Sequence, residues 1–341
     1  MKKQHLLFLL LTIIGYGAVA QQRPHYTQYL LNNYILNPAL SGIENYTDIK
    51  LSIRDQWVGL NGAPRTMYFS IQKPIGKEDY KSSSTGFDVP GENPRGTAYW
   101  SNYTASDPHH GVGMIMMNDR TGNLSRFTID FTYAYHMGLS PTVNLAAGVS
   151  AGVSQMSYDR SKATPDDPND PALGNANILV NKFRPDINAG LWLYSSNSFI
   201  GIAAQQIVPQ KFAVGDDAIY TQGKLIPHLF ATAGYRFLLT EDINAIPSIM
   251  TKYVVGAPTP LQFDLNAKFQ YQDMLWVGGG YRIKDGYNAL LGVNIAHKFN
   301  VSYSYDFTIT PINTASHGTH ELMLGFILGN TYGDTCPRNM W

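Results

Sequence analysis

The sequence has little charge of either sign, one cysteine, and no long apolar run beyond its first residues. Charged side chains make up 15% of the 341 positions, against roughly 25% in soluble domains. Because 25 Lys and Arg balance 25 Asp and Glu, the formal net charge is zero. A protein that binds nucleic acid usually carries a basic patch or stripe, so this composition argues against a nucleic-acid partner.

The one cysteine, Cys336, lies near the C-terminus. Alone it cannot form a disulfide within the chain, so it is either a free thiol or half of an intermolecular bond. A transmembrane helix needs about 18 or more apolar residues in succession, and the sequence after residue 20 contains no such run. These two absences exclude a disulfide-stabilised fold and a bundle of transmembrane helices.

The first twenty residues have the pattern of a secretory signal peptide. Lys2 and Lys3 precede an apolar core at Leu6–Ile14, and Ala18-Val19-Ala20 forms a small-x-small cleavage site. The next residue is Gln21 rather than cysteine, which argues against lipoprotein processing. We therefore predict that residues 1–20 are removed and that the mature protein leaves the cytoplasm.

What the sequence has instead is tyrosine, glycine and long alternating segments. Between residues 127 and 153, apolar or aromatic side chains alternate with small or polar ones on both sides of a turn at Gly138–Pro141. Successive side chains of a strand point to opposite faces, so this segment predicts a hairpin with one apolar and one polar face. Each arm exceeds the usual strand of about 5–6 residues and reaches the roughly 9–11 that a transmembrane strand needs.

The same alternation recurs over residues 47–329 and predicts about fourteen strands, an even number as expected of single-chain bacterial barrels. Short turns alternate with connections that are mostly longer. Outer-membrane barrels have short periplasmic turns and longer external loops, so we predict that both termini are periplasmic, with 330–341 as a tail. The long insertion 75–109 then also lies on the periplasmic side.

Two segments depart from the alternation. Ile243–Val255 contains Pro247 and has mixed faces, which predicts a bulge or kink. Residues 21–46 are apolar and aromatic without any strand alternation. We predict that this N-terminal segment packs under or inside the barrel.

A soluble β-sandwich is the alternative fold, because its strands also alternate. Sandwich strands average about 5–6 residues, however, and their turns come every 8–12 or so. In Leu261–Phe269, Lys268 shares a face with Asp264 and Asn266. A one-residue slip would move Lys268 into hydrocarbon at a cost of roughly 2–4 kcal/mol near the midplane. The long arms and consistent faces favour an all-β, antiparallel transmembrane barrel in the outer membrane.

Charged residues of both signs fall on the predicted interior face. They are Lys50, Arg54, Asp130, Asp264, Lys268, Arg282, Asp306 and Glu321. Opposite charges held close in a barrel interior form ion pairs that fix its shape. We favour such a network, with a selectivity filter as the alternative.

No catalytic or metal-binding group stands out. The acidic residues Asp166, Asp167 and Asp170 lie in the 159–182 loop, where oxygen ligands could bind calcium, but they lack the spacing of a calcium loop. Histidines near predicted loops or strand ends are His109, His110, His297, His317 and His320. None is joined by spacing to a nucleophile, and His317 with His320 has no further ligand to complete a metal site. The sequence thus predicts no enzyme, metal or cofactor.

Several motifs carry a family resemblance. The chain has QYLLNNYILNPALSG at Gln28–Gly42 and RDQWVGLNGAP at Arg54–Pro64, and further matches at 118–122, 133–136, 252–258, 303–306, 316–321 and 336–337. With these motifs it resembles the PorP/SprF family of outer-membrane proteins of the Bacteroidetes type IX secretion and gliding apparatus. The 75–109 insertion looks longer than the connection usual in that family.

The resemblance implies a partner barrel rather than an enzyme. Members are linked to the secretion machine and its periplasmic ring, or to export and surface attachment of a cargo with a type B C-terminal domain, such as an adhesin. Candidate partner-binding residues, taken from the motifs and the acidic loop, are Gln28, Tyr29, Asn37, Pro38, Arg54, Gln56, Trp57, Pro64, Asp166, Asp167 and Asp170. The rival function is a passive porin or a specific transport channel, since fourteen strands do not exclude a pore.

Overall fold

The structure is a computed structural model that describes residues 26–77, 97, 103–159, 179–208, 210–212, 223–256, 259–272, 274–295 and 298–329. The predicted signal peptide, the acidic residues Asp166, Asp167 and Asp170, His297, Cys336 and most of the 75–109 insertion lie outside these ranges. None of the helices in the described ranges has the length and apolarity to cross a membrane.

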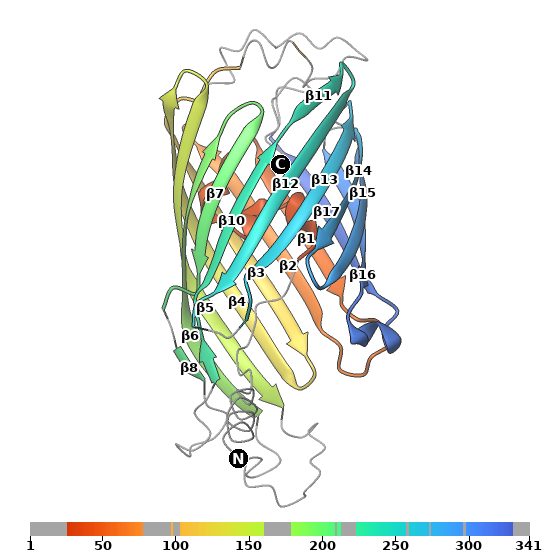
Figure 1. Cartoon of the computed structure of the whole chain (residues 1–341). Coiled ribbons are helices and arrows are strands. Elements are labelled where there is room, and N and C mark those ends of the chain that lie inside the picture. The colour runs from red at the N-terminus through yellow and green to blue at the C-terminus, as the bar shows by residue number, and fades with distance from the viewer. Residues whose placement is uncertain are drawn as a thin grey trace, which may run out of the picture.

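Fourteen antiparallel strands close into a barrel, which confirms the predicted fold (Figure 1). They are β1 (Thr47–Asp55), β2 (Arg65–Ile75), β3 (His109–Thr121), β4 (Leu124–Ser140), β5 (Val143–Asp159), β6 (Leu179–Tyr194), β7 (Ser198–Gln205), β10 (His228–Tyr235) continued by β11 (Phe237–Thr240), β12 (Ile243–Val254), β13 (Gln262–Tyr271), β14 (Leu275–Arg282), β15 (Gly286–Ile295), β16 (Phe299–Thr308) and β17 (Thr319–Leu328). A separate two-stranded sheet holds β8 (Gln210–Phe212) and β9 (Gly223–Leu225). The first strand pairs with the last, so the barrel has no open edge along this seam.

The two faces of each strand differ as the alternation predicts. In β4, Thr128, Asp130 and Thr132 are buried, while Phe127 and Phe131 on the alternate positions are exposed. Period-two alternation assigns a whole strand to one register, because a slip by one residue would exchange the two faces. The exposed apolar face is therefore the lipid-facing wall of an outer-membrane barrel.

The irregularity predicted at Pro247 lies in the neighbouring strand instead. Strand β12 pairs with β13 from Ile243 to Lys252 without a register shift. On its other side the ladder breaks at Arg236, between β10 and β11, opposite Ile246 and Pro247. Proline has no N–H to donate across a ladder, so the partner strand loses its pairing there while β12 stays regular.

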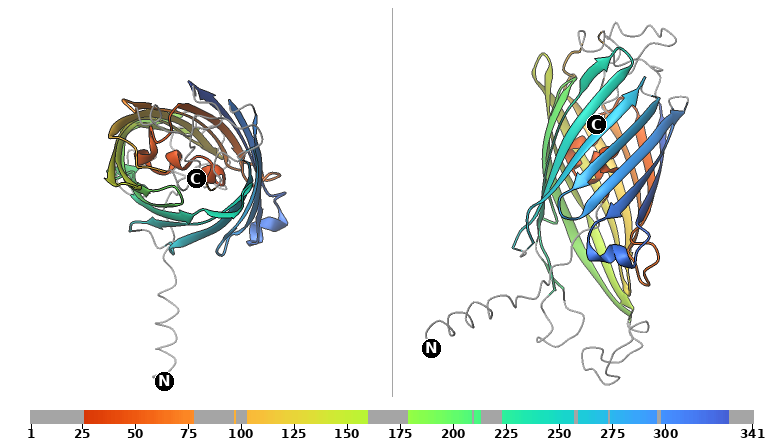
Figure 2. Two further views of the ribbon diagram at one scale, coloured as in Figure 1. Left: turned by 90° about the horizontal axis from the view of Figure 1, so that it is seen from above. Right: turned by 45° about the vertical axis from the view of Figure 1, so that its right-hand side comes forward.

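Residues 26–46, which we call the plug, lie inside the barrel. They form three short 3-10 helices, η2 (Gln28–Leu30), η3 (Asn33–Ile35) and η4 (Pro38–Leu40), which the view from above shows within the ring of strands (Figure 2). Every residue from Tyr26 to Glu44 is buried. Plug side chains such as Leu30 and Leu36 share one apolar cluster with barrel residues such as Phe230, Met250 and Trp276. The hydrophobic core of the molecule thus fills the lumen.

Glycines on the inner wall let the plug approach closely. A Cβ added at Gly111 would lie 1.7 Å from the Ser41 carbonyl oxygen, and one at Gly148 would lie 2.5 Å from the Ala39 nitrogen. Real Cβ atoms do not approach backbone this closely. The absence of side chains at these positions on β3 and β5 is what allows η4 and the turn after it to rest against the wall.

Candidate functional site

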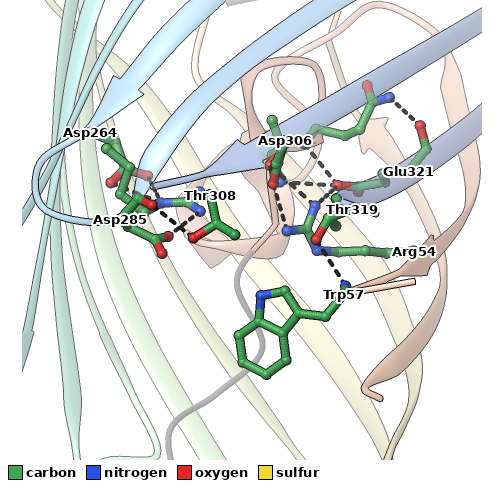
Figure 3. A network of polar contacts seen from close by, with 12 residues as sticks. Arg54, Trp57, Asp264, Asp285, Asp306, Thr308, Thr319 and Glu321 are labelled. Carbon is green, nitrogen blue, oxygen red and sulfur yellow. Dashed lines mark hydrogen bonds and ion pairs between the residues drawn. The ribbon is translucent and has the colours of Figure 1, made fainter. Parts of the chain in front are cut away.

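The barrel interior contains a buried cluster of three charges at the start of the plug. The guanidinium of Arg54 on β1 lies 2.7 Å from Asp306 on β16 and 3.1 Å from Glu321 on β17 (Figure 3). Strand register explains the contact, because Arg54 is the cross-strand partner of Glu321. All three residues are buried, so each charge depends on the others for compensation.

The first turn of the plug binds to this cluster. The backbone N–H groups of Thr27 and Gln28 donate to the Glu321 carboxylate at 3.0 and 3.3 Å. The Thr27 hydroxyl donates to Asp306 at 2.6 Å, and Arg54 donates to the same hydroxyl at 3.2 Å. Hydrogen bonds to charged groups are about twice as strong as neutral ones, so the cluster anchors the plug firmly at this end.

A second ion-pair group lies beside the first. Arg282 binds Asp264 at 3.2 Å and Asp285 at 3.1 Å. Two residues along β13 from Asp264, the Asn266 amide donates to the hydroxyl of the plug residue Tyr29 at 2.6 Å. Burial, and secondarily the charge of Asp264, raises the pKa of the Tyr29 phenol above its usual value. Tyr29 therefore remains neutral and bridges the plug to the β13 wall.

The remaining predicted interior charges are buried but lie in separate contacts. Lys50 pairs with Asp48, its neighbour two residues earlier on the same face. Asp130 accepts from the Asn188 amide at 3.4 Å, and Lys268 is buried on β13. Five of the eight residues predicted to form a network thus lie in the two neighbouring groups around Arg54 and Arg282, and Lys50 has an ion pair with Asp48.

The middle of the plug is bound to the backbone of the wall. The Asn37 amide donates to the carbonyl oxygens of Leu191 and Ile202, on β6 and β7, at 3.0 and 3.2 Å. In the reverse direction, the Gln205 amide donates to the plug carbonyls of Ile35 and Leu36 at 2.9 and 3.0 Å. The plug therefore bridges the β6–β7 seam, where the ladder has six residue pairs against sixteen between β5 and β6.

Two histidines and a lysine hold the far end of the plug. The Nε2 atoms of His136 and His109 lie 2.8 and 3.2 Å from the carbonyl oxygens of Ser41 and Gly42. Lys77 donates to the next carbonyl, that of Ile43, at 2.7 Å. The imidazole rings are stacked with their centroids 4.5 Å apart. Three consecutive plug carbonyls are thus satisfied by barrel side chains.

Sequence reasoning missed this second anchor. The sequence places His109 at a strand end and His136 within a family motif, and its pattern assigns no contact to either of them or to Lys77. The signal was present, since the alternation of β4 places His136 on the interior face, and His109 is its cross-strand partner. A buried polar side chain without a partner on its own strand needs one from elsewhere, and the plug supplies it.

The candidate partner-binding residues divide into two sets. Gln28, Tyr29, Asn37, Pro38 and Arg54 are buried in the interior, where their contacts are with the barrel itself. The other set, Gln56, Trp57 and Pro64, lies in the turn between β1 and β2 and is partly exposed. We call this end of the barrel the Trp57 mouth.

The loops of the Trp57 mouth are joined to each other. The Val58 N–H donates to the Gly318 carbonyl at 2.9 Å, and the His317 N–H donates to the Val58 carbonyl at 2.7 Å. The Trp57 N–H donates to the Thr319 hydroxyl at 3.1 Å, and Trp57 has a left-handed φ of 51° (Figure 3). Such a backbone conformation is costly outside glycine and persists only where its surroundings hold it. The β1–β2 and β16–β17 loops therefore form one fixed rim.

Two histidines that the sequence places near strand ends lie away from the plug contacts. His110 and His320 lie on the outward face, each beside two tyrosines. Within the ranges that the structure describes, no three His, Cys, Asp or Glu side chains group closely enough to hold a metal ion.

Solved structures similar in fold include the translocator domain of the autotransporter NalP from Neisseria meningitidis (11% identity, TM-score 0.42, 82% of this chain and 87% of that chain). Others are Omp33 of Acinetobacter baumannii (8%, 0.46, 84% and 100%) and the toluene transporter TodX of P. putida (10%, 0.47, 92% and 96%). At these identities no function carries over. No curated protein matches the chain.

The family model supplies the identity that these structures do not. The model of the type IX secretion system membrane protein PorP/SprF matches residues 18–326, which include the plug and nearly the whole barrel. The family resemblance predicted from the motifs is therefore confirmed, and so is the outer-membrane location. The chain belongs to the PorP/SprF family of type IX secretion system membrane proteins.

Proposed function

We propose that this protein is a closed, non-enzymatic barrel that serves type IX secretion as a partner for a cargo protein. The observation that carries the proposal is the plug, which is buried from Tyr26 to Glu44 and bonded to the wall at its start, middle and end. A lumen filled in this way favours a binding platform over a diffusion pore. The plugged lumen also gives a physical role to the Gln28–Gly42 motif.

The Trp57 mouth is the surface we propose for the partner. Strands β4 and β5 have 17 residues each, against eight in β14, so one side of the wall extends beyond the other. In Figure 1 this extension lies at the same end as the β1–β2 turn. A fixed rim beside a raised wall presents loops rigidly to a partner, and Trp is enriched among residues that dominate protein interfaces.

The orientation of the barrel belongs to the same proposal. The β4–β5 turn is short, whereas the connections at the Trp57 mouth include the longer segments 160–178 and 206–227. Outer-membrane barrels place long loops outside, so the Trp57 mouth faces the cell exterior and holds the cargo there. In this orientation β17 ends on the periplasmic side, as predicted for the C-terminus, whereas the plug begins at the exterior end, where Thr27 binds Asp306 and Glu321. A cargo with a type B C-terminal domain, such as an adhesin, is the partner that the family suggests. Contact with the periplasmic secretion ring would involve the opposite end.

Two measurements test the proposal. In planar bilayers, the purified mature barrel should show no steady conductance, and a variant lacking residues 26–46 should conduct. In detergent extracts of native membranes, shortening the 160–178 and 210–225 segments should reduce the cargo that co-purifies, as quantified by mass spectrometry. Lengthening the β4–β5 turn at residues 141–142 is the matched control at the opposite end. A steadily conducting native barrel would instead support the porin, and undiminished cargo recovery would refute the platform.

A further inference from the structure

The lipid-facing wall carries a large apolar groove. It is a hollow of about 800 Å³ across β4, β5, β6, β7, β10 and β12. Its floor consists of small side chains, namely Ala147, Ala189, Ala204 and Ala231. The larger residues beside them, such as Leu191 and Ile202, are exposed, so the groove opens outward and not into the lumen.

The strand pairing shows how the groove runs. One row of cross-strand neighbours crosses it and consists of Tyr133, Val149, Ala189, Ala204, Leu229 and Tyr253. Five steps of about 4.8 Å between neighbouring strands make the row about 24 Å long. Because barrel strands tilt by about 45°, a row perpendicular to them descends through about 17 Å of membrane. This depth is close to one leaflet, half of the roughly 30 Å hydrocarbon core.

The Tyr133 end of the groove carries polar groups suited to an anion. His110 Nδ1 lies 2.7 Å from the Tyr133 hydroxyl, and the His110 ring lies 5.2 Å from that of Tyr135. With the phenol donating to Nδ1, Nε2 of His110 keeps its proton and can donate. Lys73 on β2 is exposed, and its side chain forms no ion pair or hydrogen bond in the part of the chain that the structure describes.

Lys73 and His110 lie on the same outward face. Strand register pairs Ile75 with His110 and Lys73 with Val112, so Lys73 and His110 are diagonal neighbours. Such neighbours are about 7–8 Å apart, within reach of long side chains. A lysine on the lipid face of a barrel is costly at the midplane and tolerated near the interface. The position of Lys73 therefore marks the level of the lipid headgroups at the Tyr133 end of the groove.

We propose that this surface binds one glycerophospholipid, with its phosphate at Lys73 and His110 and an acyl chain along the alanine floor. The wall already faces lipid, and between apolar surfaces in hydrocarbon there is no hydrophobic force that would favour a protein over an acyl chain. Protein association in a membrane relies on hydrogen bonds as well as on close packing of small residues, and the four alanines of the floor supply no side-chain hydrogen bond, whereas an acyl chain needs none. The cationic end matches the charge of a phosphate.

The test is native mass spectrometry of the delipidated mature barrel in neutral detergent, titrated with phosphatidylglycerol and with a diacylglycerol of the same chains. Ala189→Leu with Ala204→Leu fills the groove and should weaken phosphatidylglycerol binding at least tenfold. Lys73→Gln with His110→Gln should reduce phosphatidylglycerol binding to the diacylglycerol level. Ala289→Leu, on the exposed face of β15 outside the groove, is the matched control and should bind as the native chain does.

Folding of each variant is checked by heat-dependent migration on gels, and Ala231→Leu replaces the double variant if that fails to fold. Equal binding by native and filled-groove barrels would mean general lipid contact and would overturn the proposal. Loss of a co-purifying polypeptide from the filled-groove barrel, with lipid binding unchanged, would assign the groove to a protein and overturn it as well.

Discussion

Replacing Arg54 by methionine removes the cation that two buried carboxylates share. Asp306 and Glu321 would keep their burial and lose their common partner. Removing one member of a buried ion pair typically costs about 3–5 kcal/mol. Because Thr27 and Gln28 bind the same two carboxylates, we expect the loss to loosen the start of the plug rather than the strand ladder.

The matched control is Arg65→Met on the neighbouring strand. Arg65 pairs with Asp55 at 2.9 Å, but the two side chains are 60% and 47% exposed. Exposed pairs contribute about 0–1 kcal/mol, so this variant should unfold in urea almost as the native barrel does. Both variants replace an arginine in an ion pair by methionine, and the two ion pairs differ chiefly in how deeply they are buried.

The assay combines urea unfolding in detergent micelles with planar-bilayer recording. Arg54→Met should lower the unfolding free energy by about 3–5 kcal/mol and give intermittent channel openings, whereas Arg65→Met should do neither. Arg54→Met combined with Glu321→Gln removes one cation and one anion and should recover part of the stability. If Arg54→Met matched Arg65→Met in both stability and conductance, the interior cluster would not anchor the plug.

Three further changes test other contacts. Gly148→Val should displace η4 and open the barrel in bilayer recordings, because even a Cβ there would lie 2.5 Å from Ala39, whereas Gly279→Ala on the outward face of β14 should leave it closed. Asn37→Ala should cost about 1–3 kcal/mol for lost hydrogen bonds, and should speed hydrogen exchange at the β6–β7 seam more than at β15–β16. His136→Leu leaves the Ser41 carbonyl and the Tyr194 hydroxyl without their His136 contacts. It should therefore make the plug accessible to protease in intact barrels, while His110→Leu on the outward face should not.

The strands and their faces follow from the sequence because one short-range rule governs them. Period-two alternation places Phe131 outward and Asp130 inward without reference to any other strand. The even strand count and the pattern of turn lengths follow in the same way. Pro247 shows the limit of the rule, since its missing N–H disturbs the strand that pairs with it and not the strand that contains it.

The contacts of the interior depend on closure, which no local pattern specifies. Arg54 and Asp306 are 252 positions apart and meet because β1 pairs with β17, and β17 with β16. The sequence could therefore place both residues in the lumen, but it could not predict that they are in contact. The plug motif posed a second difficulty, because a run such as Gln28–Gly42 suits either a partner surface or a lumen filling. The lumen position of the motif depends on distant glycines, such as Gly111, which meets Ser41 from 70 positions away, and Gly190, which meets Asn37 from 153 positions away.

The most direct test of a lumen closed by the chain's own N-terminal segment is a disulfide between plug and wall. The Asn32 amide donates to the Ser70 hydroxyl at 3.0 Å, and Ile71 beside it faces outward. In a Cys336→Ser background, Asn32→Cys with Ser70→Cys should give cross-linked peptides by mass spectrometry of outer membranes, and Asn32→Cys with Ile71→Cys should give none. Cross-linking of the second pair, or of neither, would contradict the plugged barrel.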